Sequence, residues 1–145
     1  MNSNVESIKA LFRHPDLGIL IIRAAVGFVL MFAGYNKFMG GEQVLHSIGL
    51  SINYLGVDVV PNSLATIIFG VLAAGVELVG GLALVVGVVF RTSAAFLFIT
   101  MLVATLMKID TSGGNFHEFG YPMVMGLVLV GLLFTGAGRV SLQKE

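Results

Sequence analysis

The stretch from Ser63 to Phe90 is almost entirely apolar and holds one ionisable residue, Glu77. Because about 20 apolar residues in a helix cross the hydrocarbon core of a bilayer, this stretch predicts a membrane-spanning helix. A carboxyl group near the middle of a span is costly in lipid, so it faces a protein interior or a water-filled cavity. Small residues on the same helix face let other helices approach closely, and we expect Glu77 to lie among packed helices. The packing residues on this face are Gly70, Ala74, Gly80 and Gly81.

Three other apolar stretches complete an all-α membrane protein. With the first, they predict an antiparallel bundle of four transmembrane helices at residues 17–38, 63–90, 92–109 and 121–137. Short connections between such spans favour antiparallel neighbours. The 145 residues suit one integral membrane domain, and 57% of them are hydrophobic while 11% are charged. That charge content is far below the quarter or so found in soluble domains.

The basic residues predict how the bundle is oriented. Four spans bring both termini and the turn after the second span to one side, which collects most of the lysines and arginines. The positive-inside rule makes this side cytoplasmic, so both termini are predicted to be cytoplasmic. The residues on this side are Lys9, Arg13, Arg91, Arg139 and Lys144, against Lys37 and Lys108 on the other.

Two segments outside the spans carry apolar residues at helical spacing. Val44, Leu45 and Ile48 suggest that the loop of residues 39–62 folds back onto the membrane surface. Ile8, Leu11 and Phe12 fit a short amphipathic helix at the interface, although a frayed polar tail explains residues 1–16 equally well.

Arg23 and Glu77 are the ionisable residues placed deepest in the spans. Arg23, Gly27, Gly34 and Lys37 share one face of the first span, and Gly27 and Gly34 are its predicted packing residues. This face is the natural partner of the Glu77 face, so Arg23 and Glu77 form a candidate buried pair. A protonated, neutral Glu77 is the alternative, because desolvation disfavours the charged carboxylate. Side chains lean toward the start of their own helix, so these two would lean apart.

A second group of polar residues is predicted where the bundle meets the outer interface. It consists of Lys37, Lys108, Asn115, His117 and Glu118, with Thr100 and Ala104 on the same side of the third span as Lys108. These donors could hold a quinone carbonyl or an anion while an apolar groove takes the tail. An ordinary hydrated loop with interfacial lysines explains them as well.

Several classes of function have no support in the sequence. There are no cysteines, which removes thiolate catalysis and thiolate metal sites. The three histidines lack ligand spacing, so no metal site is predicted. The formal net charge is zero, and nothing favours binding to nucleic acid. No self-sufficient catalytic constellation is evident, which leaves open whether the protein is an enzyme.

Three motifs of the chain resemble those of the DoxX family of small bacterial four-helix membrane proteins. They are AGYNKF with Gly34 and Lys37, GVELVGGLALVVGVVFRTSA with Glu77, and GAGRVSLQ from Gly136, in which Ala137 replaces the usual proline. The resemblance implies a multi-pass protein of the cell inner membrane. The family is named after a subunit of an archaeal thiosulfate:quinone oxidoreductase, and other members are linked to redox-stress assemblies.

The leading hypothesis is therefore a membrane component of a redox system, with quinone as its ligand. The chain shows no cofactor ligand of its own, so redox partner proteins would supply the cofactor. The alternatives are a small proton-linked transporter in which Glu77 titrates, and a structural anchor for partner proteins. Glycine-rich faces would serve contacts within the bundle or between copies in a homo-oligomer.

Overall fold

The computed structural model describes residues 15–138 and 141–142, and this part of the chain is all-helical. The proposed amphipathic helix at Ile8, Leu11 and Phe12 lies outside the described residues. Within these residues, four helices are long and apolar enough to cross a membrane, which confirms the predicted four-span α-helical architecture. They are α2 (Pro15–Met39), α4 (Leu64–Val86), α5 (Phe90–Thr111) and α6 (Phe116–Thr135).

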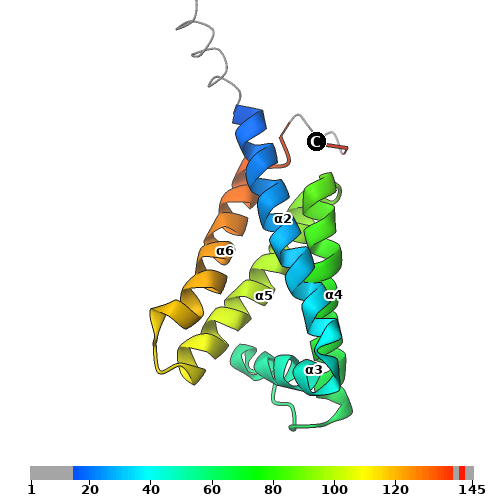
Figure 1. Cartoon of the computed structure of the whole chain (residues 1–145), viewed down its shortest axis with the longest axis vertical. Coiled ribbons are helices and arrows are strands. Elements are labelled where there is room, and N and C mark those ends of the chain that lie inside the picture. The colour runs from blue at the N-terminus through cyan, green and yellow to red at the C-terminus, as the bar shows by residue number, and fades with distance from the viewer. Residues whose placement is uncertain (1–14, 139–140, 143–145) are drawn as a thin grey trace, which may run out of the picture.

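Consecutive spans run in opposite directions, and they form two pairs (Figure 1). The α2 helix packs most extensively on α4, and α5 packs on α6. The α4 and α5 helices meet near the short turn between them and diverge from there, so the two pairs form a wedge (Figure 1). The start of α2 and the end of α6 lie together at the narrow end, which we call the terminal side (Figure 1).

A short helix crosses the wide end of this wedge. The α3 helix (Gly41–Leu50) and the 3-10 helix η1 (Ser51–Leu55) follow α2, and they lie across the spans (Figure 1). The predicted helical segment within residues 39–62 is thus present. It packs on α4 through a close backbone approach, because a Cβ added at Gly49 or at Gly70 would overlap main-chain atoms of the facing helix. We call this end of the molecule the α3 side.

The α2–α4 contact depends on small residues. A Cβ added at Gly27 would come within 2.6 Å of the Gly81 carbonyl oxygen, and one at Gly34 within 2.7 Å of the Ala74 carbonyl oxygen. The main chains of the two helices therefore touch directly, as in other membrane interfaces built from small residues. Gly80 faces α5 instead, where an added Cβ would lie 3.1 Å from Leu97.

Local signals in the sequence set the helix ends. Ser63 caps α4, and its hydroxyl accepts a hydrogen bond from the Thr66 amide. The turn into α5 runs from Gly87 to Val89, and both of these residues have a positive φ. The α5 helix therefore begins at Phe90, before the start that we predicted at residue 92. Asn115 caps α6 through the His117 amide. This cap starts α6 at Phe116, before the predicted residue 121, and Pro122 therefore lies inside the helix.

Gly34→Ala should destabilise the fold. The added methyl group would collide with the main chain of α4, and main chain cannot move aside as a flexible side chain can. Overpacking of this kind costs about 1–3 kcal/mol, which thermal unfolding in detergent would detect as a lower midpoint.

Gly75→Ala is the matched control, because nothing lies within 4 Å of a Cβ added there. It should leave the midpoint unchanged or raise it slightly, since alanine favours a helix over glycine. Equal effects of the two substitutions would contradict the close α2–α4 contact.

Candidate functional site

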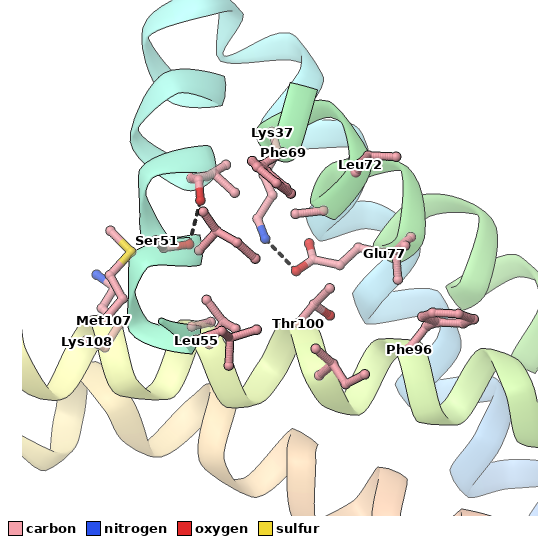
Figure 2. A pocket seen from close by; sticks show the side chains of 17 residues that line it. Lys37, Ser51, Leu55, Phe69, Leu72, Glu77, Phe96, Thr100, Met107 and Lys108 are labelled. Atoms are coloured by element: carbon pink, nitrogen blue, oxygen red, sulfur yellow. Dashed lines mark hydrogen bonds and ion pairs between the residues drawn. The ribbon is translucent and has the colours of Figure 1, made fainter. Parts of the chain in front are cut away.

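A cavity of about 460 Å³ lies in the wedge between α4 and α5, and α3 and η1 form one side of it (Figure 2). Its volume falls in the range of small-molecule sites, which is about 300–1,000 Å³. The walls are largely apolar, and the polar residues among them include Lys37 and Glu77 (Figure 2). The apolar walls come from α4, α5 and η1 and include Ile52, Phe69, Leu72, Val76, Phe96 and Val103.

The cavity opens sideways between the two diverging spans. Leu72 of α4 and Phe96 of α5 both line it, and they remain 56% and 55% exposed. Ile99 and Leu55 are also exposed lining residues. Because α4 and α5 are apolar spans, this opening faces the hydrocarbon region of the bilayer. A ligand dissolved in the membrane could enter here without crossing water.

An ion pair lies on the wall of this cavity. Lys37 Nζ donates to Glu77 Oε1 at 2.5 Å, and the two side chains come from α2 and α4 (Figure 2). The Glu77 side chain is 1% exposed and that of Lys37 is 26% exposed. The second carboxylate oxygen, Oε2, is buried and has no hydrogen-bond partner among the described residues.

Arg23 and Glu77 are both buried, but they do not form the pair that we predicted. Arg23 Nη1 donates to the carbonyl oxygen of Ala137 at 2.6 Å and lies beside Gly87, near the terminal side. The arginine thus ties α2 to the segment that follows α6. Glu77 takes Lys37 as its partner instead.

The register of α2 on α4 explains this choice. Gly27 lies against Gly81 and Gly34 against Ala74. Both contacts place Glu77 level with Met31 of α2, so at 1.5 Å per residue Glu77 is separated from Lys37 by roughly 9 Å along the axis and from Arg23 by roughly 12 Å. Side chains lean toward the start of their own helix, so in this antiparallel pair Lys37 and Glu77 lean together. The same geometry makes Arg23 lean away.

The predicted outer cluster is divided by the structure. Lys37 and Lys108 both line the cavity, together with Thr100 and Ala104 of the same α5 stripe. Glu118 is an exposed partner of Lys108, with 3.1 Å between the charged groups. Asn115 and His117 do not line the cavity. Asn115 caps α6, and His117 belongs to a separate shallow pocket on α6 with Phe116 and Tyr121.

Sequence reasoning missed the contacts that hold α3 and η1 over the cavity. His46 Nδ1 lies 2.6 Å from the hydroxyl of Thr66, which itself donates to the Ser63 carbonyl, so the imidazole is the donor. The Tyr54 hydroxyl donates to Asp110 at 2.6 Å and joins η1 to the end of α5. This hydrogen bond raises the pKa of Tyr54. No local sequence pattern indicates a contact between residues so far apart.

The fold is that of a multi-pass α-helical membrane protein with a largely apolar cavity between two of its spans. The DoxX family model matches residues 18–109, which is more than half of the chain, and the chain belongs to the DoxX family. This confirms the resemblance found in the sequence, although the closing GAGRVSLQ motif lies beyond the matched residues. No curated protein and no solved structure matches the chain. The matched region includes Lys37, Glu77 and the cavity walls from α4 and α5.

Lys37→Met should destabilise the protein far more than Lys37→Met combined with Glu77→Gln. The single change leaves a buried carboxylate without its charge partner, at a cost of about 3–5 kcal/mol, and the double change removes that charge. A double-mutant cycle, with unfolding in mixed SDS micelles followed by circular dichroism, measures the coupling.

The matched cycle joins Arg23→Met with Glu77→Gln. These sites share no hydrogen bond, so their effects should add to within about 0.5 kcal/mol. Coupling between Arg23 and Glu77 as strong as that between Lys37 and Glu77 would refute the pairing described above.

Proposed function

We propose that this DoxX family protein is the membrane component of a redox system and that its cavity binds a quinone. The observation that carries the proposal is the cavity itself, which opens toward lipid, is walled by apolar side chains and has the Lys37–Glu77 pair on its wall. A quinone matches this arrangement, since it combines a polar head with an apolar body that dissolves in the bilayer.

The Lys37 ammonium group is the donor best placed for the head group. An ammonium has three N–H donors, and Glu77 uses one of them. Lys108 also lines the cavity, but its side chain is 45% exposed and pairs with the exposed Glu118, whereas Lys37 is 26% exposed.

The remaining polar cavity residues already use their hydroxyl donors. The Ser51 hydroxyl donates to the Ile48 carbonyl oxygen in α3, and the Thr100 hydroxyl donates to the Leu97 carbonyl oxygen in α5. A quinone carbonyl that entered the cavity would therefore accept from Lys37.

The role assigned to this chain is binding, not electron transfer by itself. Its described residues contain no cluster of three or more metal-ligating side chains, and its sequence has no cysteine. Electrons would pass between the bound quinone and a partner protein that carries its own redox cofactor. We place the protein in the bacterial inner membrane with both termini in the cytoplasm, which puts the wide end of the cavity near the outer interface.

Ala104→Phe should abolish binding of decylubiquinone to the protein in lipid nanodiscs. The ring would occupy the cavity that Ala104 lines, and equilibrium binding of the radiolabelled analogue measures the loss. Lys37→Met with Glu77→Gln should weaken binding by about tenfold to a hundredfold, because a hydrogen bond from a charged donor contributes about 1.5–3 kcal/mol.

Two variants serve as controls. Ala25→Phe makes the same change on an exposed face of α2 that does not line the cavity, and it should bind as the wild type does. His117→Ala tests the part of the predicted cluster that lies outside the cavity, and it should also leave binding intact. Failure of the wild-type protein to bind decylubiquinone in either its oxidised or its reduced form would refute the proposed function.

A further inference from the structure

We propose that the cavity selects a neutral ligand bearing a hydroxyl group, so that it holds the reduced quinol in preference to the quinone. The inference rests on the proposed function and adds which redox form is bound. Its basis is Oε2 of the cavity-lining residue Glu77, a buried acceptor with no hydrogen-bond partner among the described residues. Figure 2 shows the carboxylate reaching into the space between α4, α5 and η1.

An unpaired buried acceptor is unfavourable, and a ligand that supplies a donor removes the penalty. Leaving a buried polar group without a hydrogen bond costs about 1–3 kcal/mol, and more for a charged group. Glu77 in its ion pair with Lys37 is an acceptor only. The missing partner of Oε2 is therefore an O–H or N–H group. A quinone has neither on its ring carbonyls, whereas the quinol has two hydroxyls.

The ligand group that donates to Oε2 must be neutral, because the charges of the site already balance. Lys37 and Glu77 compensate each other, and the walls around them are apolar. A cationic ligand would introduce an uncompensated charge into these surroundings, and desolvation of an unpaired ion is costly. An ammonium group could satisfy Oε2 but would fail this condition.

A hydroxyl group also satisfies both members of the ion pair at once. It donates its proton to Glu77 Oε2 and accepts a hydrogen bond from a remaining N–H of Lys37. A quinone carbonyl can accept a hydrogen bond from Lys37, but it leaves Oε2 without a donor. The difference between the two redox forms is thus one charge-assisted hydrogen bond, which corresponds to about tenfold to a hundredfold in affinity.

The test compares ligands on the wild-type protein, so no variant has to fold. Decylubiquinol, decylubiquinone and the dimethyl ether of decylubiquinol are titrated anaerobically against the protein in nanodiscs. The ether keeps the reduced ring but has no O–H donor. We expect the quinol to bind at least tenfold more tightly than either of the other two. Equal or tighter binding of the quinone would overturn the inference while leaving the proposed function in place.

A fourth ligand separates the two proposals. Dioctanoylglycerol is a neutral lipid with a free hydroxyl and no redox chemistry. If it binds while both quinone forms fail, the selection of a hydroxyl stands and the proposed redox function falls. Failure of all four ligands would refute both.

Glu77→Gln supplies the matched variant. The glutamine amide has nearly the same shape and carries an N–H donor, so it can donate to a quinone carbonyl. The preference for quinol should shrink or reverse in this variant, whereas Glu118→Gln, at the exposed partner of Lys108, should keep it. If the Glu77→Gln variant kept the wild-type preference for quinol over quinone, Oε2 would not be the acceptor that recognises the quinol hydroxyl.

Discussion

A carboxylate held inside an apolar bundle is the constraint on which this structure depends. Glu77 is buried at a depth where lipid would exclude it, so the fold must supply a cation and must keep it in reach. Lys37 does this from the neighbouring helix, and the pair satisfies one of the two carboxylate oxygens. The other oxygen, Oε2, has no hydrogen-bond donor among the described residues. An otherwise apolar cavity therefore has one acceptor that a bound ligand could satisfy.

The cavity exists because the two contacts of α4 differ in their packing. On the α2 side, Gly27, Gly34 and Gly81 bring main chains into contact, which leaves no space between the helices. On the α5 side, the helices meet around Gly80 and Leu97 near the turn and then diverge. The α3 helix and η1 close the wide end of the wedge but not its side. The close α2–α4 contact lies next to the diverging α4–α5 contact. The ion pair is therefore positioned on the wall of a space that lipid-soluble molecules can reach.

Membership of the DoxX family fixes the class of protein, and the cavity is the basis of the proposal that it binds a quinone. The proposed quinone site needs no catalytic group from this chain, because binding and orientation are what its residues can supply. Holding the quinol with its hydroxyl between Lys37 and Glu77 would present the reduced form to a partner protein. The lateral opening would let oxidised product return to the bilayer.

The sequence by itself determined the four spans, the burial of Glu77 and the small-residue faces, because hydropathy and helical periodicity are local properties of the chain. It also identified Lys37, Lys108 and the Thr100 stripe, which line the cavity. Only the tertiary structure decided that Glu77 pairs with Lys37 and that Arg23 donates to the Ala137 carbonyl oxygen. These partners depend on the register of α2 against α4 and on the direction in which each side chain leans. The cavity likewise depends on an angle between α4 and α5, and no local pattern encodes an angle.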